Sequence, residues 1–132
     1  MKKLFLILSL LVAFTLAQSQ VVTQVTTNDT ITDAETVYSS SVLLGKLYYV
    51  NIQVVCDSLT GNPAGTAKLQ GSNDGTNFTD ISGKTLSLNG SGTYTTFWEL
   101  SPGTCKYVRV AYVSTGTATI KLNAWIRATP YK

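Results

Sequence analysis

The sequence contains no histidine, and this absence bears on most kinds of catalysis and metal binding. Histidine is the usual general base near neutral pH, the usual activator of a serine or cysteine nucleophile, and the commonest metal ligand. No serine lies in a Gly-x-Ser-x-Gly nucleophile turn either. The sequence therefore predicts a protein that is not an enzyme and that needs no cofactor.

Paired carboxylates are the catalytic chemistry that remains, because two Asp or Glu residues suffice for glycoside hydrolysis. Asp57, Asp74, Asp80 and Glu99 are among the acids available for this. Asp74 and Asp80 lie in and just after a predicted turn, where Asp ordinarily accepts backbone N–H bonds. The same segment offers a weak calcium pattern, without the closing Glu of an EF-hand, made of Asn73, Asp74, Asn77 and Asp80. A turn is favoured over a glycosidase or a metal site.

Charged residues are scarce, at 13% of the chain, and the basic ones form no run. Lys2 and Lys3 precede the apolar stretch at the start, so the rest of the chain has eight basic and seven acidic residues, about one net positive charge. Proteins that bind nucleic acid rely on a basic surface patch. Nucleic acid is therefore not an expected partner.

The longest hydrophobic run covers residues 4–16, after two lysines and before the small residues at a plausible cleavage site. This is the pattern of a secretory signal. As a helix, such a run reaches about 20 Å, which is short of the roughly 30 Å hydrocarbon core of a bilayer. We therefore predict a hydrophobic helix at residues 1–19 that is a signal peptide, with a retained membrane anchor as the alternative. The expected location is extracellular, at a cell surface, or in a virion.

Beyond this segment, apolar side chains recur at every second position, which indicates strands. The two longest alternating runs are residues 47–56 and 117–127, and shorter runs cover residues 66–70, 94–100 and 108–112. Glycine-containing turns separate them, including Asp74-Gly75 and Asn89-Gly90. The pattern predicts an all-β antiparallel sandwich, jelly-roll or immunoglobulin-like, of seven to nine strands with the two longest runs central. We assign the sandwich domain to residues 42–132 and an extended arm to residues 20–41.

Two motifs carry a family resemblance. One is Gly-Thr-Ala-Lys-Leu-Gln-Gly-Ser-Asn-Asp-Gly-Thr-Asn-Phe from Gly65, and the other is Lys-Tyr-Val-Arg-Val-Ala-Tyr from Lys106. Together they resemble small β-sandwich modules of tailed-phage and other virion structural proteins. More distantly, they are similar to the discoidin-type carbohydrate-binding sandwich, in which Trp is usual where this chain has Phe78. The resemblance covers about half of the chain and implies a sandwich fold more directly than a ligand.

Cys56 and Cys105 are the two cysteines of a chain that we expect to be exported. Each lies at the expected end of a strand, so we predict a disulfide between them, which would stabilise the domain. Two separate buried thiols are the alternative, because free cysteine is often buried.

Two segments are candidates for contacts with other molecules. The first is an outward face of the predicted strand at 117–127, comprising Lys121, Asn123, Trp125 and Arg127. An exposed Trp among hydrogen-bonding side chains suits a sugar ring or a protein interface, although Trp125 packed against the other sheet is the alternative. The second is the Thr-rich arm, whose apolar residues are Val21, Val22, Val25 and Ile31. We expect the arm to add a strand to another subunit, so that its deletion leaves a folded domain that no longer assembles.

These features predict a structural protein of a virion, filament or cell surface that acts through contacts with copies of itself or with other structural proteins. A secreted carbohydrate-binding or adhesion module, with surface glycans as partners, is the alternative. Contact with a membrane is expected only if the segment at residues 1–19 is retained.

Overall fold

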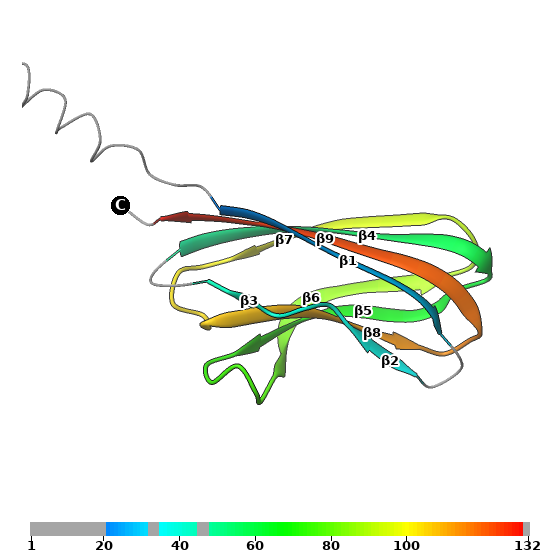
Figure 1. Ribbon diagram of the computed structural model, residues 1–132, viewed down its shortest axis with the longest axis horizontal. Helices are drawn as coiled ribbons and strands as arrows, with labels where there is room; N and C mark the ends of the chain where they lie inside the picture. Colours follow the sequence, from blue (N-terminus) through cyan, green and yellow to red (C-terminus); the bar gives the residue numbers. More distant parts are fainter. Residues whose placement is uncertain (1–20, 32–34, 45–47, 131–132) are drawn as a thin grey trace, which may run out of the picture.

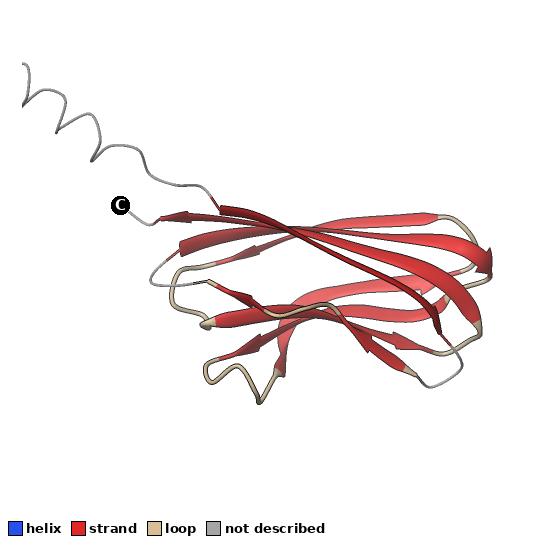
Figure 2. Ribbon diagram, in the orientation of Figure 1, coloured by secondary structure: helices blue, strands red, loops and turns tan. Residues whose placement is uncertain are grey.

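The computed structural model describes residues 21–31, 35–44 and 48–130. The predicted signal or anchor helix at residues 1–19 lies outside these described residues. No helix within them is long and apolar enough to cross a membrane. The described chain is instead built from strands and loops (Figure 2).

Nine strands make up the described structure, and all of their pairings are antiparallel. Their bounds are β1 Val21–Ile31, β2 Thr36–Tyr38, β3 Val42–Leu43, β4 Tyr48–Gly61, β5 Ala64–Ser72, β6 Thr79–Asn89, β7 Thr93–Leu100, β8 Tyr107–Ser114 and β9 Ala118–Pro130. The predicted all-β antiparallel fold is confirmed.

The strands form two stacked sheets, seen from the side in Figure 1. One sheet has the order β1-β9-β4-β7, and the other has the order β2-β8-β5-β6 with β3 also paired to β8. Because β2 and β3 pair with the same strand, they are two halves of one interrupted strand. With that pair counted once, the two sheets have four strands each, in the order of a jelly roll. The topology thus decides between the two sandwich types left open by the sequence.

The core lies between the two sheets and consists of the alternating apolar rows that the sequence predicts. β4 contributes Val50, Ile52, Val54 and Cys56, and β9 contributes Ala118, Ile120, Leu122, Ala124 and Ile126. These two strands occupy the inner positions of their sheet, as expected from their length. Trp98 packs into the same core. Each large apolar side chain that becomes buried contributes about 1.5–3 kcal/mol to folding.

The core also contains the phenol of Tyr112, which donates a hydrogen bond to the Ala64 carbonyl oxygen at 2.9 Å.

The segment assigned by sequence to a separate arm belongs to the sandwich. β1 pairs with β9 at every position from Val21 to Ile31, and β2 and β3 pair with β8. In this register Val21, Val25 and Ile31 stand opposite Ala128, Ala124 and Ala118 of β9, and Val22 stands opposite Arg127. The segment predicted to be an arm, residues 20–41, therefore contributes β1 and β2 to the two sheets of the sandwich.

Cys56 and Cys105 are both free thiols, so the predicted disulfide is absent from the structure. The sequence places Cys56 at a strand end, but β4 continues to Gly61, and Cys56 lies inside the strand, fully buried between Tyr94 and Leu122 of the neighbouring strands. Cys105 precedes β8 of the other sheet, lies against Gly71 and lines a surface hollow. The prediction relied on a strand end at Cys56, which the structure places inside β4.

The two thiols should react very differently with an alkylating reagent. Burial raises the pKa of Cys56 to about 12, and burial also raises the pKa of Cys105, which remains half-buried. The thiolate is the reactive form, so both thiols should react slowly at neutral pH, and Cys56 should be protected by the core as well. Iodoacetamide followed by peptide mass spectrometry should modify Cys105 in the folded protein and Cys56 only in denaturant. Recovery of a linked Cys56–Cys105 peptide from the non-reduced protein would show instead that the disulfide forms.

Candidate functional site

The predicted interaction face lies on the outer side of the four-stranded sheet, and its four residues differ in how far they are exposed. Trp125 is partly exposed and Arg127 is exposed, whereas Asn123 is 6% exposed and therefore buried. Trp125 and Arg127 line a shallow hollow of about 460 Å³ together with Asn51 and Gln53 of β4 and Phe97 of β7. Lys121 is not part of this lining and stands opposite Asp57. We call the five lining residues the aromatic hollow.

The strand register explains how three strands build the aromatic hollow. Gln53 is paired with Trp125 on β9 and with Phe97 on β7, so these three residues form one row across the sheet. Asn51 is paired with Arg127 on β9, which makes a second row beside the first. Paired residues in antiparallel strands share a face, and neighbouring strands are about 4.8 Å apart. The row from Trp125 to Phe97 therefore spans about 10 Å across two strand spacings.

Sequence reasoning missed Asn51, Gln53 and Phe97. Alternation assigns Asn51 and Gln53 to the polar face of their strand, but it does not reveal which strand lies beside it. Phe97 is 69% exposed, the most exposed of the large hydrophobic side chains in the described residues, and an apolar residue in a strand is ordinarily expected to face the core.

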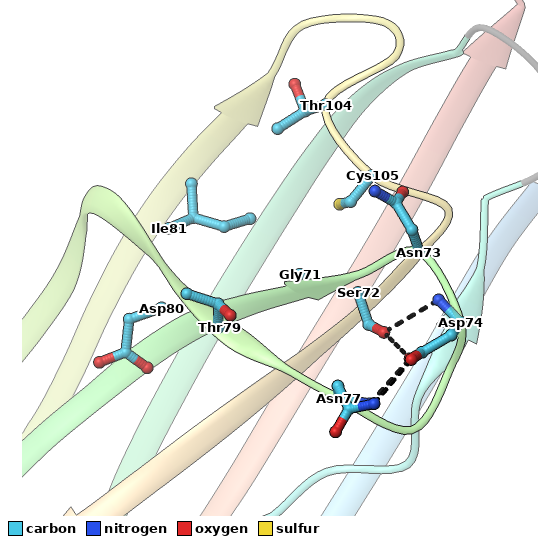
Figure 3. Close-up of a pocket in the computed structure, with 10 residues that line it drawn as sticks. All are labelled: Gly71, Ser72, Asn73, Asp74, Asn77, Thr79, Asp80, Ile81, Thr104 and Cys105. Carbon is cyan, nitrogen blue, oxygen red and sulfur yellow. Dashed lines mark hydrogen bonds between the residues drawn. The ribbon is translucent and has the colours of Figure 1, made fainter.

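A second hollow, of about 420 Å³, lies beside the loop that connects β5 to β6 (Figure 3). Asp74 organises this loop. Its Oδ1 accepts hydrogen bonds from the backbone N–H groups of Thr76 and Asn77, both at 2.8 Å, and from the Ser72 hydroxyl at 2.8 Å. Its Oδ2 accepts one from the Asn77 side-chain amide at 2.7 Å. Gly75 has a φ of 77°, which glycine adopts without strain. The predicted hairpin is present, with a loop longer than the two-residue turn that Asp74-Gly75 indicates.

The four residues of the weak calcium pattern, Asn73, Asp74, Asn77 and Asp80, all line this hollow, but their two carboxylates are directed to different places. Asp80 points away from Asp74 in Figure 3. Its Oδ2 accepts a hydrogen bond from Lys68 Nζ at 2.8 Å, and its Oδ1 accepts one from Gln70 Nε2 at 2.8 Å. Both carboxylates thus already have several N–H donors, and the described part of the chain holds no group of three His, Cys, Asp or Glu side chains placed to bind a metal. In the structure these two carboxylates stabilise the loop and the strands beside it.

Phe78 and Arg109, from the two family motifs, meet on the outer side of the five-stranded sheet. The Arg109 guanidinium carbon lies 4.0 Å from the ring centroids of Phe78 and of Tyr38 on β2. Its Nε donates a hydrogen bond to Gln70 Oε1 at 2.8 Å, which extends the Asp80 and Lys68 contacts across the sheet. Cation–π contacts at exposed positions are worth about 0.5–1 kcal/mol each. The motifs therefore contribute to fold stability, with Phe78 in the position where the discoidin-type pattern has Trp.

The bonds to Asp74 make a testable contribution to stability. The Asn77 side-chain amide, the backbone N–H groups of Asn77 and Thr76, and the Ser72 hydroxyl hold the pKa of Asp74 well below its ordinary value of 3.8. A carboxyl whose pKa is lowered by folding stabilises the protein above its unfolded-state pKa, and this stability is lost as the pH falls toward the folded-state value. Asp74→Asn should therefore lower the melting temperature by a few degrees at pH 7, and the difference from the unmodified chain should shrink below about pH 4.

Melting curves from circular dichroism between pH 7 and pH 2 would measure this effect. Asp57→Asn is a suitable control, because the Asp57 carboxylate lies outside the loop and accepts a hydrogen bond from the Thr93 hydroxyl at 2.8 Å. Some acid sensitivity should persist in Asp74→Asn, since contacts with Lys68 and Gln70 also lower the pKa of Asp80. A constant difference in melting temperature at every pH would contradict the assigned role of the ionised Asp74.

No protein-family model matches the sequence, and no curated protein sequence does either. Solved structures nevertheless share the fold. A chain of the Bacillus endospore appendages, a family of disulfide-linked pili, is 12% identical with a TM-score of 0.53, and the match covers 86% of this chain and 91% of that one. The PBSX exported protein XepA is 14% identical with a TM-score of 0.57, over 85% of this chain and 38% of XepA.

The enzymatically active domain of tailspike protein 4 from bacteriophage CBA120 is 11% identical with a TM-score of 0.50, over 83% of this chain and 18% of the tailspike chain. The chain thus spans most of a pilus chain but well under half of the two phage-related proteins. At these identities the similarity is one of fold. The predicted resemblance to β-sandwich modules of phage and virion proteins is confirmed at that level.

Proposed function

We propose that this chain is a non-enzymatic structural subunit that assembles with copies of itself into an extracellular appendage, filament or particle. The observation that carries the proposal is the contrast between the edges of the two sheets. An exposed edge strand presents unpaired N–H and C=O groups that can pair with another chain, and proteins that stay monomeric usually shorten, bend or charge their edges.

The five-stranded sheet has protected edges. On one side, β2 has three residues and β3 has two. On the other side, the pairing of β6 with β5 shifts register between Lys68 and Gln70, and Gly83 in β6 has a φ of 73°. β6 also carries Asp80 and Lys84. Short strands, register irregularities and charges all discourage pairing with a second chain.

The four-stranded sheet has long, regular edges. β7 pairs with β4 from Thr93 to Leu100 without a register shift, and Glu99 is its single charged residue. β1 pairs with β9 at each of its 11 residues, and Asp29 is its single charged residue. Among the described residues, no strand pairs with the outer side of β1 or of β7. This sheet therefore offers two open edges.

The phase of the β4–β7 ladder shows which groups face the open edge. The Ser58 N–H donates to the Gly92 carbonyl oxygen at 3.1 Å. Bonded and non-bonded pairs alternate along an antiparallel ladder, so every second residue from Gly92 bonds to β4. The residues between them turn their N–H and C=O groups outward; these are Thr93, Thr95, Phe97 and Glu99.

The two open edges are complementary in direction. Three successive antiparallel pairings separate β1 from β7, so these strands run in opposite directions. The β1 strand of a second copy in the same orientation is therefore antiparallel to β7 of the first and can continue the sheet. An interface that joins two different edges produces rings when the rotation closes and open filaments when it does not.

The comparison with the pilus chain supports this proposal. The match covers nearly all of a chain from disulfide-linked pili, so a single domain of this fold can be an entire subunit of such an appendage. The location outside the cytoplasm is part of the proposal and relies on the predicted signal at residues 1–19.

The first experiment is to express the chain from residue 20 and to follow its association by multi-angle light scattering and negative-stain electron microscopy over a range of concentrations. Rings or filaments with a regular repeat would support the proposal. A monomer that persists at millimolar concentration, with or without high salt, would contradict it.

A further inference from the structure

The aromatic hollow has a composition that differs from the interior of the protein and from the open edges. It places two aromatic rings, Trp125 and Phe97, at the ends of a row whose centre is the Gln53 amide. Asn51 and Arg127 add an amide and a guanidinium beside this row. No hydrogen bond or ion pair of the described residues engages the side chains of Asn51, Gln53 or Arg127. The hollow thus combines apolar faces with several hydrogen-bonding groups that are available to a ligand.

We propose that the aromatic hollow binds a neutral oligosaccharide. A sugar ring has an apolar C–H face and a rim of hydroxyl groups that both donate and accept hydrogen bonds. Trp and Phe rings supply flat apolar surfaces for the C–H face, and the indole N–H can also form a hydrogen bond. The amides of Asn51 and Gln53 can both donate and accept hydrogen bonds, so they match the hydroxyl groups.

The chemistry of the lining favours a sugar over a protein partner. Apolar protein surface placed over Asn51, Gln53 and Arg127 would leave their polar atoms without water, at a cost for each unsatisfied group. The hydroxyl groups of a sugar would instead form hydrogen bonds with these polar atoms. A patch about 10 Å across also covers only on the order of 100 Å², far less than the roughly 800 Å² per partner of a stable protein interface. A few sugar units fit these dimensions better than a second protein.

The charges favour a neutral sugar over an acidic one. Arg127 is the single charged residue of the lining, and Asn51, its partner in the register, is also paired with Glu99 on the other side. One positive and one negative residue therefore flank the Asn51 amide. An acidic glycan would meet both charges, whereas a neutral one would use Arg127 as a hydrogen-bond donor.

Affinity electrophoresis in gels that contain soluble polysaccharides tests the proposal directly. The panel should include β-glucan, α-glucan, xylan and galactomannan as neutral probes and an alginate as the acidic probe. We expect at least one neutral polysaccharide to retard the unmodified chain. Trp125→Ala should weaken this binding at least about tenfold, as expected for an aromatic side chain that supplies a main contact surface, and Gln53→Ala should weaken it several-fold.

Leu43→Ala provides a matched control, because Leu43 is 61% exposed and lies on the other sheet. Tryptophan fluorescence gives a second readout: Trp98 is 4% exposed, so a ligand-induced change should come from Trp125 and should disappear in Trp125→Phe. No retardation by any neutral probe, retardation by alginate alone, or equal retardation of Trp125→Ala would overturn the inference.

Light scattering on Trp125→Ala separates this inference from the proposed assembly. The open edge of β7 uses backbone groups, so the variant should associate like the unmodified chain. If Trp125→Ala abolishes association, the hollow is an interface between copies and the sugar site is rejected.

Discussion

A chain that carries Thr95→Pro should fold normally and remain monomeric under conditions in which the unmodified chain assembles. The Thr95 N–H belongs to the set that faces the open edge of β7, so its loss removes no hydrogen bond to β4. Proline is tolerated in an edge strand when the missing N–H faces solvent. The proline ring would project into the place of an incoming strand, and the edge would lose a donor. The expected effect on assembly is close to complete.

Thr96→Pro is the matched contrast, because it makes the same change one residue further along. The Thr96 N–H faces Val54 of β4 in the ladder, so this variant loses an internal bond and should be destabilised by several kcal/mol. Thr95→Ala removes the same side chain as Thr95→Pro but keeps the N–H, and should assemble normally. Melting temperature together with light scattering distinguishes the three variants. Normal assembly of a folded Thr95→Pro chain would exclude β7 as the contact edge.

The fold was predictable because it depends on patterns that local physics imposes. The rows through Ile52 on β4 and Ile126 on β9 are buried as the period-two alternation requires, since one face of each strand packs on the core. The glycine turns separate the strands where expected. Trp98 and Leu100 occupy alternate positions of β7, and both are buried, as the same alternation requires.

The candidate site was less predictable because it depends on which strands lie side by side. Trp125 was identified from its own strand, but Gln53 and Phe97 are 72 and 28 residues away in sequence and reach it only through the jelly-roll order. Cys56 illustrates a related difficulty. The end of β4 is set by pairing with β9 as far as Gly61 and not by a signal near the cysteine.

The second large effect concerns β1, which the sequence predicts to be an arm that another subunit receives. In the structure it pairs with β9 of its own chain along all 11 residues. Cross-strand pairs contribute about 0.2–1 kcal/mol each, so the loss of this strand should cost on the order of 2–10 kcal/mol. Total domain stability is about 5–15 kcal/mol. A chain that begins at residue 33 should therefore melt far below the chain that begins at residue 20, or fail to fold.

A synthetic peptide of residues 20–32 tests whether the strand must belong to the same chain. The shortened chain exposes the edge of β9, and the peptide can restore the antiparallel pairing between Val21 and Ala128 and onward to Ile31. Addition of the peptide in excess should raise the melting temperature of the shortened chain, because a ligand that binds the folded state stabilises it by mass action. A peptide with Val25→Pro should be much weaker, since a proline at an internal position of the strand interrupts the ladder.

The outcome also separates two ways in which copies can associate. Rescue by the peptide shows that β9 accepts a strand from another molecule, so that exchange of β1 between neighbours becomes a second route to assembly beside the β7 edge. A shortened chain that is as stable as the longer one, with no response to the peptide, would show that β1 contributes nothing to the domain. The pairing of β1 with β9 would then be refuted, and the predicted free arm would replace it.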